Sequence, residues 1–140
     1  MRTVIVAILT TVTLGSPVVA SAESWILWAQ EYNGEFPNAS LVRTNTLGVY
    51  PASAPCAAAA REHLTVQARE FLQQATRKAQ NKNDPYFIYG KAEMAGVQET
   101  TNPPGARVEI THMTTLRGGR TWKELNIYRA QCWPPGVTPR

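Results

Sequence analysis

One stretch decides the fold: SAPCAAAAREHLTVQAREFLQQATRKAQ, residues 53–80. Ser53 is a residue type that caps the free N–H groups of a helix start, and Pro55 is tolerated in the first turn. After Pro55 the stretch contains neither Gly nor Pro, and strong helix formers dominate it. We therefore predict one long helix that ends near Gln80.

Apolar residues recur at intervals of three and four in this stretch, which predicts one buried helix face. They are Cys56, Ala60, Leu64, Ala68, Phe71, Leu72, Ala75 and Ala79. Charged residues such as Arg61 and Glu62 fall largely outside this stripe. Cys56 is thus expected to face the core, where the alanine run 57–60 lets the helix approach a sheet closely.

Strand-forming sequences flank the helix, at residues 25–32, 40–50, 107–116 and 121–132. In the second of them Leu41 and Arg43 are expected on one face and Val42 on the other. The last two runs are joined by Gly118-Gly119, which suits a two-residue hairpin turn with positive φ. A helix on one face of a small antiparallel sheet, an α+β fold, is the economical arrangement of these elements.

Residues 85–100 allow two interpretations. The run Tyr86-Phe87-Ile88-Tyr89 favours a strand, whereas Asp84-Pro85 is typical of a helix start and favours a short helix to about Val97. Residues 100–106, which include Asn102-Pro103-Pro104-Gly105, are expected to form a loop. Residues 133–140 are expected to form an extended, Pro-rich tail after a single domain over residues 23–132.

The first 22 residues carry the features of a secretory signal peptide. Arg2 is followed by an uncharged run from Val4 to Leu14, and Ala20-Ser21-Ala22 matches a cleavage site of small residues. The apolar run is shorter than the roughly 20 residues that span a bilayer. We expect export to the periplasm or the medium, with no membrane span in residues 23–140; an uncleaved N-terminal anchor is the alternative.

The two cysteines, Cys56 and Cys132, are expected to form a disulfide, because an even cysteine count in an exported chain favours one. Neither has the spacing of a metal site or a haem attachment to His63 or His112. On the last strand, Tyr128, Ala130 and Cys132 share one face. That face must be the core face if the bond is to form.

Short motifs resemble those of a group of small exported bacterial proteins to which no activity is assigned. They are Trp25-Ile26-Leu27-Trp28 after the signal peptide, Tyr50-Pro51 leading to Cys56, and Tyr128-Arg129-Ala130-Gln131-Cys132-Trp133-Pro134 before the Pro-rich end. The resemblance covers the two ends and the helix start. It implies export and the disulfide, and it implies no activity.

The net charge and the positions of the titratable residues favour neither nucleic-acid binding nor a catalytic cluster. The net charge is +4, or one less without Arg2, whereas nucleic-acid binders concentrate more positive charge on one face. The single Asp, Asp84, precedes a Pro, and His112 and Glu109 are three residues apart on a strand and so face opposite sides. His63 and His112 are expected to be packing residues, and we expect no metal or cofactor.

Basic residues Arg117, Arg120 and Lys123, with Arg107 as a further member, and the tail aromatic Trp133 are the candidate partner contacts. They suit an acidic protein or an anionic envelope surface. The alternative is a solvated turn that protects the strand edges, with Trp133 as a lid on the core near the disulfide.

Two functions follow as hypotheses. The favoured one is an exported non-enzymatic domain with a binding or envelope accessory role. The alternative is a small secreted hydrolase of nuclease type, in which two histidines and a Glu supply acid–base catalysis.

We predict that replacing both Cys56 and Cys132 by Ala lowers the free energy of unfolding. Loss of the crosslink between them costs roughly 4 to 5 kcal/mol by the chain-entropy relation, and measured values are often lower. Urea unfolding of both proteins under oxidising conditions measures the effect. Equal midpoints would show that the bond does not form or does not constrain the unfolded chain.

Overall fold

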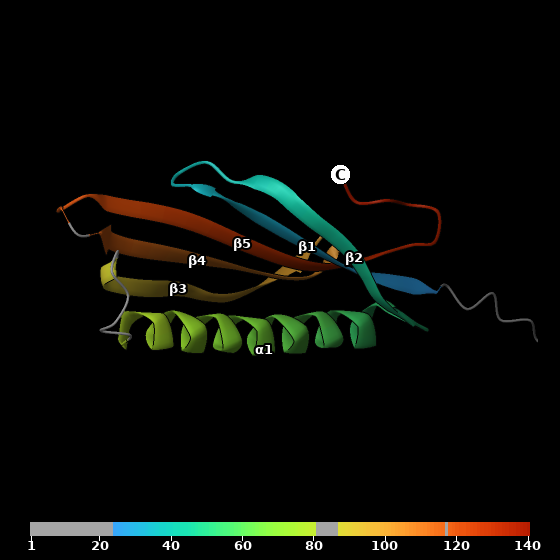
Figure 1. Cartoon of the computed structure of the whole chain (residues 1–140). Coiled ribbons are helices and arrows are strands. Elements are labelled where there is room, and N and C mark those ends of the chain that lie inside the picture. Colours follow the sequence, from blue (N-terminus) through green and yellow to red (C-terminus); the bar gives the residue numbers. More distant parts are fainter. Residues whose placement is uncertain (1–23, 81–86, 117) are drawn as a thin grey trace, which may run out of the picture.

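Five antiparallel strands form one sheet, and a long helix lies across one face of it (Figure 1). The computed structural model describes residues 24–80, 87–116 and 118–140, so the predicted signal peptide lies outside it. The elements in chain order are β1 Trp25–Glu35, β2 Ser40–Tyr50, α1 Ser53–Gln80, β3 Phe87–Thr101, β4 Pro104–Leu116 and β5 Thr121–Trp133. The predicted α+β fold, a helix on an antiparallel sheet, is confirmed.

The helix has the predicted bounds and buries the predicted face. Cys56, Ala60 and Leu64 are fully buried, and Ala68 and Ala75 nearly so. Phe71 and Leu72 are partly buried against the same core, and the side chain of Ala79 lies outside the described residues. Each fully buried Leu contributes about 1.5–3 kcal/mol relative to an exposed one.

The sheet order is β2-β1-β5-β4-β3, so β5, the last strand in sequence, is the central one. In register, Leu27 lies opposite Cys132, and Ala29 opposite Ala130, on the face that carries α1. The core between the layers also holds Val108, Ile110 and Tyr128. The alanines Ala60 and Ala68 on the helix, and Ala106 and Ala130 on the sheet, are at most 1% exposed, so their small side chains let the layers pack closely.

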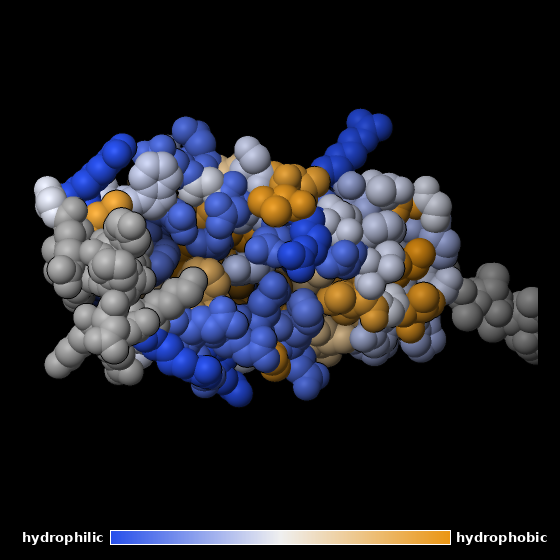
Figure 2. Space-filling model, viewed as in Figure 1, coloured by the Kyte–Doolittle hydropathy of each residue, from blue (hydrophilic) through white to orange (hydrophobic). Residues whose placement is uncertain are grey.

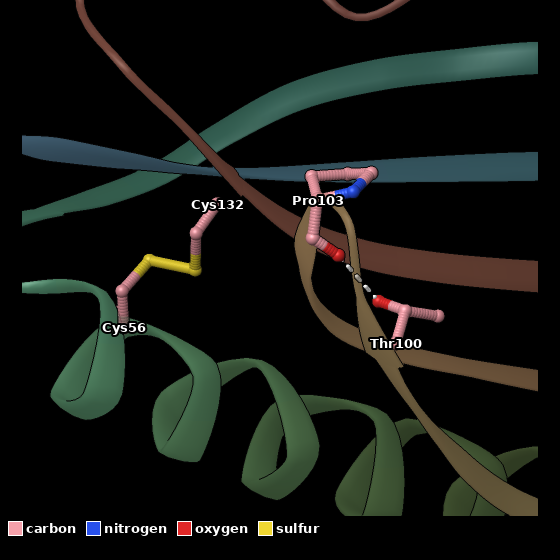
Figure 3. The surroundings of a disulfide bond; sticks show 4 residues. All are labelled: Cys56, Thr100, Pro103 and Cys132. Carbon is pink, nitrogen blue, oxygen red and sulfur yellow. Dashed lines mark hydrogen bonds between the residues drawn. A yellow bond between two sulfur atoms is a disulfide. The ribbon is translucent and has the colours of Figure 1, made fainter.

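The disulfide joins the first turn of α1 to the end of β5 (Figure 3). Its two Cα atoms, in Cys56 and Cys132, are 6.1 Å apart, which is within the ordinary range. Both cysteines are fully buried. The predicted bond and the predicted core face of β5 are therefore confirmed.

The structure of residues 87–101 decides between the two interpretations of residues 85–100. Phe87–Thr101 is strand β3, so the alternative of a short helix is wrong. The expected loop over residues 100–106 is wrong as well, because β4 begins at Pro104 and only Asn102 and Pro103 lie in the turn. Thr100 Oγ1 closes this turn by donating a hydrogen bond of 2.9 Å to the Pro103 carbonyl (Figure 3).

Strand β2 departs from regular alternation at two bulges. Leu27 lies opposite Gly48 and Trp28 opposite Thr46, which leaves Leu47 unpaired, and Val42 is left unpaired in the same way. Because of the bulge at Val42, Leu41 lies opposite Tyr32 and Arg43 opposite Glu31. Leu41 and Arg43 are therefore on opposite faces, and the prediction that they share one is wrong.

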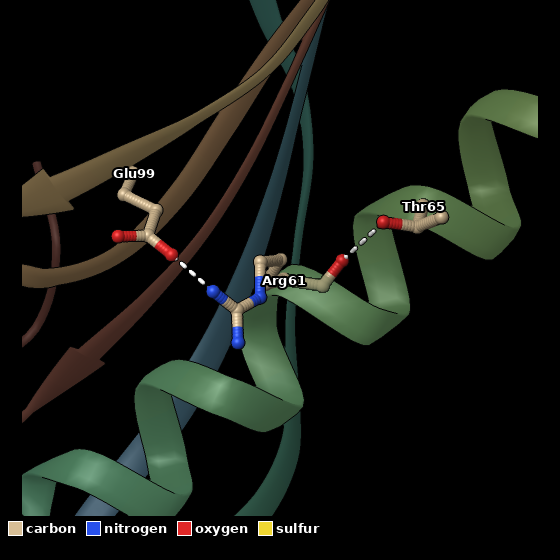
Figure 4. Close-up of polar contacts among 3 residues, drawn as sticks. All are labelled: Arg61, Thr65 and Glu99. Carbon is tan, nitrogen blue, oxygen red and sulfur yellow. Dashed lines mark hydrogen bonds and ion pairs between the residues drawn. The ribbon is translucent and has the colours of Figure 1, made fainter.

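The helix covers only part of the sheet. It packs mainly against β3, β4 and β5 and has few contacts with β1 and β2, which rise away from it (Figure 1). On the β3 side, Arg61 forms an ion pair with Glu99, and Thr65 Oγ1 donates to the Arg61 carbonyl (Figure 4). More than half of each charged side chain is exposed, so packing rather than this ion pair holds the helix.

The predicted hairpin turn between β4 and β5 is formed with positive φ at both glycines, 104° at Gly118 and 80° at Gly119. Within the described residues, no helix is both long enough and apolar enough to cross a membrane.

We predict that Gly105→Ala is strongly destabilising, by about 3 kcal/mol or more, because overpacking and backbone strain add. A Cβ at Gly105 would lie 2.2 Å from the Ala130 carbonyl oxygen on the neighbouring strand. Gly48→Ala is the control, since its Cβ would meet only the Tyr50 ring, at 3.3 Å. Urea unfolding compares the two, and equal losses of stability would contradict the close approach of β4 and β5.

Candidate functional site

A polar cleft lies where α1 leaves β1 and β2 uncovered. Its volume is about 180 Å³, smaller than the roughly 300 Å³ of typical ligand pockets, so it suits one side chain or a very small ligand. Strands β1 and β2 form one wall, and the flank of α1 forms the other. The lining residues are Ala29, Gln30, Glu31, Arg43, Asn45, Leu47, His63 and Gln67.

A row of three polar side chains crosses the sheet beside this cleft. Tyr128, Glu31 and Arg43 are direct neighbours on β5, β1 and β2, and they share the face turned toward α1. Burial, followed by the carboxylate of Glu31, raises the pKa of Tyr128 to about 12, although Arg43 acts in the opposite direction. The phenol therefore stays protonated, and it remains a neutral group next to a carboxylate and a guanidinium.

His63 contributes the imidazole from the helix side. Burial lowers its pKa below the ordinary value of 6.5, and the nearby carboxylate of Glu70 partly offsets this effect. The imidazole is thus neutral near pH 7 and provides one hydrogen-bond donor and one acceptor. The cleft offers amides, a neutral imidazole and one charge of each sign, which suits the recognition of a polar side chain.

The edge strand β2 adjoins the cleft and is unusually apolar for an exposed edge. Leu41, Val42, Leu47 and Val49 are 41–68% exposed. They are spread along the strand from residue 41 to residue 49, and the face drawn in Figure 2 shows hydrophobic groups at several places among hydrophilic ones. The opposite edge, β3, carries the exposed charges Lys91, Glu93 and Glu99.

The partner contacts predicted from the sequence do not form one surface. Arg120 is exposed next to the β4–β5 turn, and Lys123 lies over the Phe36 ring at 3.8 Å. Trp133 is at the other end of β5, about 33 Å from Lys123 at 3.3 Å per residue. Arg107 lies within the sheet and pairs with Glu109, and Arg117 lies outside the described residues.

The position of Trp133 also differs from the alternative prediction, in which it forms a lid on the core near the disulfide. It follows Cys132 on β5 and therefore points to the face away from α1, opposite Ile26 on β1. Its side chain is half-buried there.

The two histidines are separated by the core. His63 lies at the cleft, whereas His112 packs edge-on against Phe71, with ring centroids 6.2 Å apart. The acid–base pair of the hydrolase hypothesis is therefore not formed by these side chains. Among the residues that the structure describes, no three His, Cys, Asp or Glu side chains are placed to hold a metal ion.

Sequence reasoning did not find the cleft. Arg43 lies on the face toward α1 while Leu41 lies on the other because of the bulge at Val42, and such shifts leave only a weakened alternation as a signal. The helix residues His63 and Gln67 lie at the margin of the apolar stripe, where the sequence pattern does not distinguish a packing residue from a site residue.

Comparison with protein-family models, curated proteins and solved structures finds no match to this chain. The site is therefore interpreted from its own geometry.

We predict that the His63 imidazole titrates below 6.5 in an NMR titration, and that Glu70→Gln lowers its pKa further by removing a carboxylate. Glu35→Gln, at the far end of β1, is the control and should leave this pKa unchanged. A titration at or above 6.5 would contradict the burial of His63.

The same pKa shift predicts how stability depends on pH. Since the pKa of His63 is lower in the folded chain than in the unfolded chain, the unfolded chain binds more protons as the pH falls. Between pH 7.5 and about 5.5, wild type should therefore lose more unfolding free energy than His63→Gln. Urea unfolding curves of both proteins at both pH values measure the difference. An equal loss of unfolding free energy in the two proteins would show that His63 does not cause the pH dependence.

Proposed function

We propose that this chain is an exported, non-enzymatic binding protein, and that β2 with its adjoining cleft receives a partner protein. Export is supported by the pattern of residues 1–22, by the disulfide and by the resemblance to small exported bacterial proteins. Disulfides persist mainly in oxidising compartments outside the cytosol.

The contrast between the two sheet edges carries the proposal. Natural proteins protect exposed strand edges with charges, bulges or short strands, because an open edge pairs with other chains. Edge β3 has charged side chains, whereas edge β2 exposes four apolar side chains and one charge, Arg43. Apolar side chains that stand singly are ordinary on a protein surface, so the proposal rests on their position beside the cleft and on an edge that lacks the charges of β3.

The bulges of β2 define the mode of contact. They interrupt the outer edge at Val42 and Leu47, so a partner strand cannot pair along its whole length. We expect contact through side chains instead, with apolar groups on Val42 and Leu47 and a carboxylate facing Arg43, since Leu47 and Arg43 both line the cleft. One partner side chain then enters the cleft beside His63.

The hydrolase alternative is not favoured by a specific observation. The cleft is lined by His63 and Glu31, but neither Ser nor Cys lines it as a nucleophile, and His112 lies elsewhere. The proposed contact uses the neutral imidazole for recognition.

Site-specific photo-crosslinking in the producing cell tests the proposal. We predict that p-benzoylphenylalanine at position 42 or 47 captures one discrete protein. The same group at position 94, an apolar residue of β3 that is 41% exposed, is the matched control and should not capture it.

A second variant in the same cells distinguishes contact from proximity. Arg43→Glu should reduce capture from position 47 by about tenfold, since a lost charged hydrogen bond costs about 1.5–3 kcal/mol. Equal capture from positions 94 and 47, or no capture from either β2 position, would contradict the proposed contact surface.

A further inference from the structure

The cleft between α1 and the β1–β2 hairpin has its two opposite charges at different depths. Glu31 on β1 is half-buried, and so are His63 and Gln67 on the wall that α1 provides. Arg43 and Leu47, on the edge strand β2, are exposed. A group that enters the cleft from solvent therefore passes a guanidinium at the mouth and meets a carboxylate further in.

The carboxylate of Glu31 is not neutralised within the described part of the chain. Arg43 lies directly opposite it on β2, but no ion pair joins the two side chains. Burial and the Glu31 carboxylate raise the pKa of Tyr128, the neighbour on β5, to about 12, so this phenol carries no charge near pH 7. A half-buried carboxylate has lost part of its hydration, and a cation that reaches it forms a charged hydrogen bond in place of those water contacts.

The wall on α1 adds hydrogen-bond acceptors without adding charge. The imidazole of His63 is neutral near pH 7 because burial lowers its pKa below 6.5, so one of its ring nitrogens is an acceptor. Gln67 lies about one helical turn further along α1 and contributes an amide oxygen. A cationic donor beside Glu31 therefore has acceptors on the sheet wall and on the helix wall.

The size and the apolar lining of the cleft limit this cation to one slender group. The volume is about 180 Å³, and Ala29 and Leu47 line it beside the polar side chains. A lysine side chain combines an apolar stem, which suits Ala29 and Leu47, with a compact ammonium whose three donors suit acceptors on two walls. The guanidinium of arginine is planar and matches the two oxygens of a single carboxylate, so it makes less use of the helix wall.

We infer that the partner side chain that enters this cleft is a lysine. Its ammonium donates to the Glu31 carboxylate, with His63 and Gln67 as further acceptors, and its stem lies against Leu47. This inference rests on the proposed function, because it names the partner group that the β2 contact places over the cleft. The partner carboxylate that faces Arg43 then lies next to this lysine, so the recognised segment carries one charge of each sign.

An NMR titration of the disulfide-bonded protein with a capped lysine, Nα-acetyl-lysine N-methylamide, tests the inference without the partner. We expect saturable shifts of the His63 ring signals with a dissociation constant of about 1–10 mM, the range for so small a ligand. The Nε-acetylated form of the same capped lysine keeps the stem and removes the charge. It should bind at least about tenfold more weakly.

Two variants on one face of β1 separate the effect of this carboxylate from that of charge in general. Glu31→Gln should weaken binding of the capped lysine at least about tenfold, because a charged hydrogen bond is lost. Glu35→Gln removes the same charge four residues further along the strand, about 13 Å away at 3.3 Å per residue. It should change the affinity less than twofold.

The inference is overturned if the capped lysine gives no saturable shift, if its Nε-acetylated form binds as tightly, or if Glu35→Gln weakens binding as much as Glu31→Gln. Should Glu31→Gln fail to fold by circular dichroism, the comparison of the two ligands on the wild-type protein decides the outcome.

Photo-crosslinking from position 47 distinguishes failure of this inference from failure of the proposed function. Glu31→Gln should reduce capture about tenfold, and Glu35→Gln should leave it unchanged. Undiminished capture in Glu31→Gln would overturn the assignment of lysine and leave the β2 contact intact. Saturable binding of the capped lysine without capture from position 42 or 47 would support the lysine site and contradict the proposed function alone.

Discussion

The bond between Cys56 and Cys132 is the constraint on which the rest of the arrangement depends. It fixes the first turn of α1 to the end of β5, and β5 is the central strand of the sheet. From that point the helix runs over β3, β4 and β5, where alanines on both layers allow close packing. A crosslink from α1 to an edge strand would not determine in this way which strands the helix covers.

This off-centre position of the helix leaves β1 and β2 uncovered on the helix side. On the helix side, β1 and β2 contribute Glu31 and Arg43 to a cleft that His63 completes from α1. On the other side, no helix covers the sheet within the described residues. The cleft is thus a consequence of a helix layer that is narrower than the sheet.

Much of the fold was predictable because its signals are local. The apolar stripe from Cys56 to Ala75, the Gly118-Gly119 turn and the core face of β5 each depend on neighbouring residues. The loop expected at residues 100–106 was wrong because prolines that close a tight hairpin look like those of a long loop. The distance between the candidate contacts Lys123 and Trp133 could not be predicted without the fold, because they lie at opposite ends of one extended strand. Bulges at Val42 and Leu47 depend on pairing with β1 and cannot be read from β2 alone.

Native-state hydrogen exchange tests most directly whether α1 supports only one side of the sheet. Amides under the helix should open only with global unfolding, whereas a hairpin without helix cover should open locally at lower free energy. We therefore predict that the amides of β2 that donate to β1 exchange well before those that join β4 and β5. Equal protection of β2 and β4 would contradict an uncovered β1–β2 hairpin, and with it the surface on which the proposed partner binds.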